Sequence, residues 1–415
     1  MQNVTAQQEN IHTTDILVVG GGVVGLALCQ GLLHDKLGLH VSLVSSGSIH
    51  QSNVYADDVR AIALAHSTEC HLAAMGIPLP ECHAQIQQIH ISDRGHLGQT
   101  RLRAQEQGVS ALGYVTQLSA LETVITQQLS KQSADDIALF ENTQCRVVEL
   151  SDEGVTARLA TGQVIHAKTI VFADGQGTDL KTSLGIVPNM IDYQQHALVS
   201  IVGVSRSGPA RYQTELTAFE RFTENGPLAL LPMHRDALQD THCTQYYSLV
   251  WCGTEQDITA LCALDDDRFM SELQQAFGDR AGLFSYVSTR QHFPLKLTCH
   301  SGRAQRVFTL GNAAQALHPI AGQGFNLGIR DVISFIASIK ELSSIEMLGA
   351  HSHQDRFAAL RETDRQIVIN MTSLLVTVFS NAIPGLVLGR NKALNLLHAI
   401  PPIKKWFAKK AMGYQ

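Results

Sequence analysis

The sequence lacks the residue spacings that hold metal ions in proteins. Its eight cysteines include no C-x-x-C pair, and its 19 histidines form no H-E-x-x-H motif. Scattered cysteines are typical of reduced thiols in the cytosol, so we expect a cytoplasmic protein whose cysteines are structural. His351 and His353, the closest pair of histidines, lie in a polar segment and are interpreted as solvated loop residues. The sequence therefore predicts no metal site.

Charge is also scarce, at 16% of the residues, and its balance is acidic, with a formal net charge of −6. This balance argues against nucleic acid as a partner. Met1 to Thr14 has no basic segment followed by an apolar one, so no secretory signal is expected. Gln366 to Gly389 is uncharged and long enough to cross a bilayer. Its polar side chains and the Pro384-Gly385 break predict a buried helix followed by a turn instead.

The most informative segment that is present lies near the start of the chain. Ile16 to Val19 is a short apolar run typical of a buried parallel strand, and Val23 to Leu33 has the pattern of a helix. Between them, Gly20, Gly22 and Gly25 form G-x-G-x-x-G. In this context the first glycine permits the turn, the second lets the backbone approach a pyrophosphate, and the third lets helix and strand pack closely. The pattern predicts a dinucleotide site on the N-terminus of the helix.

The second strand, His40 to Ser46, ends in Ser45 where an acidic residue that binds the ribose is usual. A hydroxyl still hydrogen-bonds a ribose, but more weakly than a carboxylate. Residues 58–65 are interpreted as a bend into a helix. Within them, Arg60 either faces the phosphate or ribityl chain of the cofactor or forms an exposed salt bridge. The spacing of the residues does not distinguish these two roles.

Two further segments combine a strand end with glycine. Lys168 to Ala173 reads as a buried strand that ends at Asp174-Gly175. Another strand runs into Gly311-Asn312, and a glycine-rich turn then opens a helix from about Phe325. Free N–H groups at that helix can stabilise negative charge, such as that on a reduced flavin ring. One nicotinamide nucleotide needs only the first glycine motif, whereas FAD uses all three.

The 415 residues exceed one ordinary core, and 45% hydrophobic content suits a soluble enzyme. The patterns predict an α/β fold in which a Rossmann-like FAD-binding domain is interleaved with a mostly antiparallel-sheet substrate domain, followed by C-terminal helices. The expected FAD-binding segments are 1–80, 113–185 and 291–340, the substrate segments are 81–112 and 186–290, and the C-terminal helical region is 341–415.

These motifs, in this order, resemble the FAD-dependent aromatic monooxygenases of the p-hydroxybenzoate hydroxylase type, and within them the ubiquinone-biosynthesis branch. The resemblance covers nearly the whole chain. The departures lie around the nucleotide: Ser45, Gln117 in place of an acid, Asn312 in place of Asp, and a Thr178-to-Lys181 tail in place of S-x-x-R. The segments that carry the resemblance are Gly311–Gly328, Ser92–Gly98, Ala111–Val115, Phe219–Met233 and Met412-Gly413.

The resemblance implies roles for particular residues. His318 and Pro319 lie near the flavin ring, where His318 either assists proton transfer or only packs and hydrogen-bonds. Arg221 approaches the flavin or nicotinamide, or pairs with Glu220 or Glu224. The expected substrate-cavity residues are Leu230, Pro232 and Met233. The expected FAD contacts are Gly20, Gly22, Val23, Val24, Gly25, Ser45, Arg60, Gln117, Asp174, Gly175, Gly311, Asn312, Gly322, Gln323, Gly324, Phe325 and Asn326.

The resemblance also implies the chemistry. NAD(P)H reduces FAD, and the reduced flavin captures O₂ as a C4a-hydroperoxide that hydroxylates a prenylated methoxyphenol in ubiquinone biosynthesis. The cofactor carries the difficult step, so no nucleophilic triad is needed. No second nucleotide-binding pattern is present, so NAD(P)H is expected to bind only transiently.

The end of the chain is basic. From Arg365 onward there are seven Lys or Arg and no Asp or Glu. After Pro401-Pro402, the residues Ile403, Trp406, Phe407 and Ala411 share one helix face. This pattern is that of an interfacial helix attracted to anionic lipid, or of a docked terminal helix with a solvated basic side.

Other functions remain open at this stage. One is a sister hydroxylase that acts at another ring position. Another is a flavin halogenase or prenyl reductase, although the halogenase W-x-W-x-I-P run is missing and the two tryptophans are Trp251 and Trp406. A third is a non-catalytic, FAD-retaining subunit of a ubiquinone-biosynthesis complex.

Overall fold

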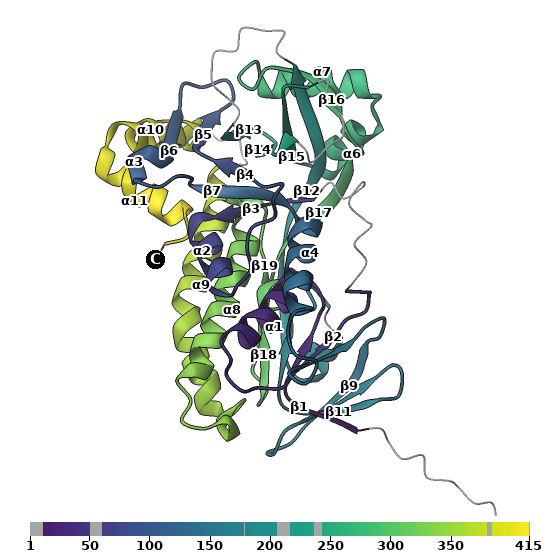
Figure 1. Cartoon of the computed structure of the whole chain (residues 1–415). Helices are drawn as coiled ribbons and strands as arrows, with labels where there is room; N and C mark the ends of the chain where they lie inside the picture. The colour runs from purple at the N-terminus through teal and green to yellow at the C-terminus, as the bar shows by residue number, and fades with distance from the viewer. Residues whose placement is uncertain are drawn as a thin grey trace, which may run out of the picture.

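The computed structural model describes residues 11–49, 60–177, 179–205, 216–235, 243–379 and 384–414. Asp58 and Thr178 lie outside these residues, and so does part of the uncharged segment that begins at Gln366. Among the described helices, none combines the length and the hydropathy needed to cross a bilayer. Figure 1 shows an elongated molecule with one sheet at each end and two long helices running between them.

The N-terminal strand lies inside a mixed sheet of seven strands. β1 pairs in parallel with β2 and β11, and β18 pairs in parallel with β11. Successive residues of β1 are buried on opposite faces, because Ile16 and Val18 join one apolar cluster whereas Leu17 and Val19 join another. The spatial order is β8 (Ile137–Phe140), β2 (Val41–Val44), β1 (Ile11–Val19), β11 (Val164–Phe172), β10 (Val155–Leu159) and β9 (Cys145–Leu150), with β18 (Val307–Thr309) beside β11.

Three helices cover one face of this sheet. They share a core in which Leu26, Ile125 and Phe335 are buried. The helices are α1 (Val23–His34), α4 (Leu118–Leu129) and α8 (Gln323–Lys340). The short helix α5 (Asp179–Ser183) follows β11.

The second sheet is larger and mostly antiparallel. One face packs against α6 (Glu255–Ala263) and α7 (Asp266–Phe277), which contribute Ile258 and Phe277 to a shared core with Phe219. The spatial order is β19 (Gln315–Ala316), β17 (Gln291–Ser301), β12 (Val187–Ser205), β15 (Gln245–Gly253), β14 (Gly226–Met233), β13 (Thr217–Thr223), β5 (Gln88–Asp93) and β6 (Gln99–Arg103), with β16 (Leu283–Val287) beside β12.

A small three-stranded sheet connects the two large ones. Its strands are β3 (Ala61–Ala65), β7 (Gly113–Gln117) and β4 (Ala84–Ile86), and the short helices α2 (His66–Ala74) and α3 (Ala104–Gln107) lie next to it in the chain. The interpretation of residues 58–65 as a bend into a helix was wrong, because residues 61–65 pair with β7 and the helix begins only at His66.

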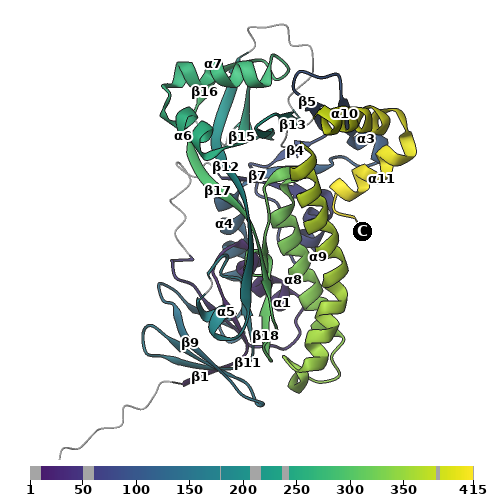
Figure 2. The ribbon, with the colours of Figure 1, turned by 180° about the vertical axis from the view of Figure 1, so that it is seen from behind.

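The C-terminal helices run from one sheet to the other (Figures 1 and 2). α9 (His351–Phe379) lies along α8, and α10 (Pro384–Ala399) and α11 (Pro401–Ala411) fold over β5 and β6. A buried ion pair holds this region, since Arg390 donates to both oxygens of Asp93, at 2.9 and 3.1 Å.

The structure confirms the expected mixed fold with an interleaved antiparallel sheet and C-terminal helices. Within that fold, β17 extends the nine-stranded sheet beyond residue 290. The interpretation of His353 as solvated was wrong. It is fully buried in α9, with Nδ1 accepting from Gly349 N and Nε2 hydrogen-bonded to Ser338 Oγ.

Candidate active site

The turn from β1 to α1 shows why glycine is needed at two positions. Gly20 has a φ of 122°, and a Cβ there would lie 2.4 Å from Ala173 O. A Cβ on Gly25 would lie 2.0 Å from Gly20 O, so helix and turn touch. Gly22 differs, because nothing lies within 4 Å of its Cβ position. The backbone at Gly22 is thus open to a bound group.

The second motif follows β11. Lys181, which is fully buried, donates to Asp174 Oδ1 at 2.7 Å. Burial raises the pKa of Asp174, and the hydrogen bond and charge of Lys181 oppose that rise. Gly175 has a φ of 67° and open space at its Cβ position. Lys181 therefore fixes the carboxylate and also donates to Gly175 O at 3.4 Å, so the open side of Gly175 is the one toward its Cβ position.

The third motif is held in place by the buried carboxylate of Asp331. Asp331 Oδ2 accepts from Gly311 N and from Gln315 Nε2, both at 2.9 Å, and Arg361 Nε donates to Asp331 Oδ1 at 2.7 Å. Gly311 has a φ of 59°, a value that favours glycine. Asn312, beside it, is exposed.

The three motifs meet at one edge of the seven-stranded sheet. The Cβ position of Gly20 lies 2.6 Å from Asp174 N, and those of Gly311 and Gly328 each lie 3.1 Å from a methyl group of Val24. All three follow the carboxyl ends of parallel strands, where α/β folds bind ligands. Val23, in the first turn of α1, is buried.

Two long helices begin at this edge without a side-chain cap. Gly22 precedes α1 and Gly322 precedes α8, and neither end has a side-chain hydrogen bond to the first turn. Their N–H groups and dipoles favour an anionic ligand. Two uncapped helix ends, with open backbone at Gly22, Gly175 and Gly324, fit an extended dinucleotide such as FAD.

Three other residues that were predicted to contact the cofactor, Ser45, Gln117 and Arg60, lie farther out around this edge. Ser45 is buried, its Oγ accepts from Gly47 N at 3.3 Å, and it lies 2.3 Å from the Cβ position of Gly21. Gln117 is buried at the start of α4. Arg60 is exposed, and its carbonyl accepts from Leu118 N at 3.0 Å.

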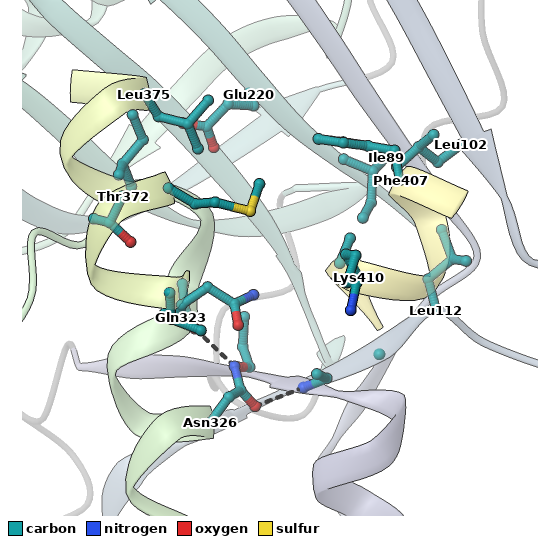
Figure 3. Close-up of a pocket in the computed structure, with 18 of the residues that line it drawn as sticks. Ile89, Leu102, Leu112, Glu220, Gln323, Asn326, Thr372, Leu375, Phe407 and Lys410 are labelled. Atoms are coloured by element: carbon teal, nitrogen blue, oxygen red, sulfur yellow. Dashed lines mark hydrogen bonds between the residues drawn. The ribbon is translucent and has the colours of Figure 1, made fainter. Parts of the chain in front are cut away.

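The turn at the start of α8 is held by Asn326. Its Oδ1 accepts from Ala65 N at 2.8 Å, and its Nδ2 donates to Ala63 O at 3.0 Å and to Gly322 O at 2.7 Å (Figure 3). The amide is thus engaged with β3 and with its own turn, so its side chain positions the site. Gln323, Gly324 and Phe325 follow Gly322 and are partly exposed.

His318 is buried and neutral. Its Nδ1 accepts from Ile320 N at 3.1 Å, so Nε2 carries the proton and donates to Gln195 Oε1 at 3.2 Å. Burial lowers the pKa of His318 to about 4. Both ring nitrogens are engaged in holding the turn, while the neighbouring Pro319 lines the adjacent cavity.

That cavity has a volume of about 740 Å³ and lies between the nine-stranded sheet and the C-terminal helices. Its lining is largely apolar. The turn before α8 contributes Pro319, Ile320, Gly322 and Gln323, and the segment before β7 contributes Leu112. The sheets contribute Ala63, Ile86, Ile89, Ile91, Leu102, Ala218, Phe222, Ala229, Leu231 and Val250. The helices contribute Leu360, Ile367, Met371, Leu375, Leu394, Leu397, Phe407 and Ala411.

The predicted substrate residues are not on the cavity wall. Leu230 is buried in the core against α6 and α7, and Met233 packs with Ile201 and Tyr246. Pro232 also does not line the cavity. Side chains alternate along β14, so its cavity residues are Ala229 and Leu231. The strand that carries the three predicted residues thus borders the cavity, but through two other residues of that strand.

Arg221 also points away from the cavity. Its Nε donates to Ala276 O on α7 at 3.1 Å, and its NH1 donates to Ser92 Oγ at 3.3 Å. Burial lowers the pKa of its guanidinium to about 10. Neither partner is Glu220 or Glu224, the two glutamates considered from the sequence. Through these hydrogen bonds Arg221 links β13 to β5 and α7.

Sequence reasoning missed Glu220, which lines the cavity on β13. Its Oε1 is shielded and has no hydrogen-bond partner among the residues that the structure describes. The alternation of Phe219 and Arg221 toward α7 puts Glu220 on the opposite face, so the strand pattern contained the signal. The sequence does not show which face of the strand carries the cavity, so the alternation alone could not identify Glu220 as a cavity residue.

The chain matches the family model described as FAD binding domain over residues 13–344. It is 30% identical over 406 residues to the ubiquinone hydroxylase UbiL of Rhodospirillum rubrum, covering 96% of this chain and 89% of that protein. It is 26% identical over 411 residues to 3-demethoxyubiquinol 3-hydroxylase of Escherichia coli, covering 96% and 98%.

A solved structure has the same fold. The p-nitrophenol 4-monooxygenase PnpA of Pseudomonas putida superposes with a TM-score of 0.74 at 17% identity, covering 97% of this chain and 99% of that one.

Proposed function

The chain belongs to the FAD-binding domain family that its residues 13–344 match, and from this premise we propose that it hydroxylates a polyprenylated methoxyphenol in ubiquinone biosynthesis. It is an FAD-dependent monooxygenase of the ubiquinone-hydroxylase type. The proposed substrate is 2-polyprenyl-6-methoxyphenol.

One observation carries this proposal: a cavity of about 740 Å³ with a largely apolar lining adjoins the turn where α8 begins. Ligand cavities of roughly 300–1,000 Å³ are usual for small molecules. An apolar phenol with a prenyl chain gains free energy from burial there, at about 25 cal/mol for each Å² removed from water.

The residues of this chain bind the cofactor and orient the substrate. Gly22, Gly175 and the first turns of α1 and α8 would hold FAD, which when bound supplies the activation of O₂. Asn326 and His318 keep the turn of residues 318–322 in place. The apolar wall excludes water from the reacting centre, which limits wasteful side reactions. NAD(P)H is the proposed reductant, and it binds transiently because the fold has one dinucleotide edge.

The location of the cavity supports a membrane-derived substrate. Its wall includes Leu394, Phe407 and Lys410 of α10 and α11. The outer side of α11 exposes Ile403 (43%) and Trp406 (55%), among the lysines of the basic tail. In this proposal α11 contacts the surface of an anionic membrane and the prenyl chain enters along the C-terminal helices.

Purified holoprotein tests the proposed reaction. With NADPH, ¹⁸O₂ and 2-geranyl-6-methoxyphenol, we expect a product one labelled oxygen heavier, with NADPH oxidation that depends on the phenol. Labelled product from a differently substituted ring would transfer the assignment to a sister hydroxylase. Bound FAD without turnover of any prenylated phenol would favour the non-catalytic subunit of a biosynthetic complex.

A further inference from the structure

An acidic side chain lines the cavity at a place where apolar residues surround it. Glu220 lies on β13 between Phe219 and Arg221, which turn to the opposite face of the sheet. Its Oε1 is shielded from solvent and has no hydrogen-bond partner in the described part of the chain. In Figure 3, Glu220 and Leu375 lie across the cavity from Gln323 and Asn326.

The other charged side chains that line the cavity either form ion pairs with one another or come from other elements than β13. Arg330 pairs with Asp364 at 2.7 Å, and Arg361 holds the second oxygen of that carboxylate. Lys410 lines the cavity from α11. Burial raises the pKa of the Cys252 thiol on β15, and the charge of the Glu220 carboxylate adds to that rise. The side chains from α9 that line the cavity beside Leu375, such as Met371 and Thr372, are neutral.

A carboxyl without a partner in an apolar site costs free energy. Groups of this kind concentrate at functional sites, where an apolar environment adjusts a carboxyl to acid–base work. Burial raises the pKa of Glu220 to about 7, which brings it closer to the value of roughly 10 for a phenol. Glu220 is therefore a stronger base than an ordinary carboxylate.

We propose that the Glu220 carboxylate accepts a hydrogen bond from the phenolic hydroxyl of the substrate and takes its proton as the ring is hydroxylated. This proposal rests on the proposed function. The phenol O–H bond breaks, an O–H bond forms on the carboxylate, and the negative charge moves to the phenolate oxygen. The phenolate raises electron density at the para carbon, where oxygen is added. The para carbon loses its own proton to water as the ring regains aromaticity, and the proton held by Glu220 returns to the ring oxygen as product leaves.

The position of Glu220 also orients the substrate. A phenol whose hydroxyl is held at β13 presents its opposite edge toward the turn at Pro319 to Gln323, which lines the other side of the cavity. The apolar prenyl chain then follows the lining from α9 to α11. The Glu220 carboxylate thus favours substrates that carry a phenolic hydroxyl, and it determines which ring carbon receives the added oxygen.

The test compares Glu220→Gln with Glu224→Gln, because Glu224 is exposed on the β13–β14 turn. With 2-geranyl-6-methoxyphenol, the wild type and Glu224→Gln should show kcat/KM rising with pH through about 7. Glu220→Gln should lose this limb and lower kcat by roughly 10²–10⁴-fold with a much smaller change in KM. A difference spectrum of the bound phenol should show the absorption shift of a phenol hydrogen-bonded to a carboxylate in the wild type, and a smaller shift in Glu220→Gln.

Two results separate the possible failures. If the wild type hydroxylates the phenol and Glu220→Gln keeps both the pH limb and the bound-phenol spectrum, the role of Glu220 is wrong. If the wild type neither binds nor hydroxylates prenylated phenols, the proposed function itself fails and this inference with it. FAD content and the melting temperature of each variant establish that it is folded.

Discussion

At the scale of single residues, His318 and Glu220 both titrate away from their ordinary ranges, and for the same reason. Burial disfavours the charged form of each side chain, so the pKa of His318 falls to about 4 and that of Glu220 rises to about 7. Their surroundings differ, because both nitrogens of His318 are hydrogen-bonded, whereas no described residue hydrogen-bonds to Glu220 Oε1. We therefore assign structure to the first and proton transfer to the second.

His318→Asn should change stability more than mechanism. The unfolded state binds the proton near pH 6.5 and the folded state only near 4, so His318 lowers stability progressively as pH falls from 6.5 to 4. The effect amounts to about 3 kcal/mol at most. Urea unfolding at pH 7 and pH 4.5 should show a smaller acid loss in the variant than in the wild type.

The same variant separates the two residues in catalysis. His318→Asn should keep the shape of the pH–rate profile, even if kcat falls because the turn is less well held. A profile that loses its limb in His318→Asn would return His318 to proton transfer.

The residues of β14 test which face meets the substrate. Ala229→Leu adds volume to the cavity wall and should raise KM for 2-geranyl-6-methoxyphenol at least several-fold while the melting temperature stays nearly unchanged. Leu230→Ala empties a core site and should cost about 2–5 kcal/mol of unfolding free energy, with KM unchanged in the fraction that folds. The opposite assignment of effects would show that the cavity lies on the other face.

At the scale of elements, the glycine motif has separable parts. Gly22→Ala meets open space and has an ordinary φ of −78°, so the fold should survive. The added methyl group lies where a pyrophosphate would approach, so FAD affinity should fall about tenfold or more. Gly25→Ala would place Cβ 2.0 Å from Gly20 O and should destabilise the apoprotein itself.

Titration of the apoproteins with FAD, together with their melting temperatures, checks this pair. A Gly22→Ala protein that melts normally and binds FAD as tightly as the wild type would place the pyrophosphate elsewhere.

The elements also show what the sequence could predict. Strong local patterns were enough for β1, α1, β11 and the antiparallel character around β12 and β15, because each is specified by its own periodicity. β3 was misread because the short run at residues 61–65 lacks a distinctive pattern and becomes a strand only by pairing with β7. The sequence shows the alternation along β14 but not which face meets the cavity, because that depends on α9 and α7, which lie far away in the chain.

At the scale of the whole molecule, the C-terminal helices close the cavity and end in an exposed apolar and basic surface. Phe407 and Ala411 line the cavity, whereas Ile403 and Trp406 stay exposed. One side of the helix is therefore docked, and the exposed side is the one that the proposed contact with lipid would use.

Ile403→Ser combined with Trp406→Ser should reduce flotation with vesicles of phosphatidylcholine and phosphatidylglycerol, since interfacial binding scales with buried apolar area and with attraction to anionic lipid. Val147→Ser is the matched control, because Val147 on β9 is similarly exposed (42%) at the far end of the molecule. Rising salt should weaken wild-type flotation. Equal flotation of all three proteins would remove the membrane contact from the account.

The most direct test of the central claim is a mass-spectrometric profile of quinone intermediates in cells that lack this gene. We expect these cells to lose ubiquinone and to accumulate 2-polyprenyl-6-methoxyphenol, and we expect the wild-type gene, but not Glu220→Gln, to reverse both effects. Accumulation of a different intermediate would contradict the assigned ring position. Unchanged ubiquinone, in cells that carry no second gene for the same step, would contradict the proposed pathway.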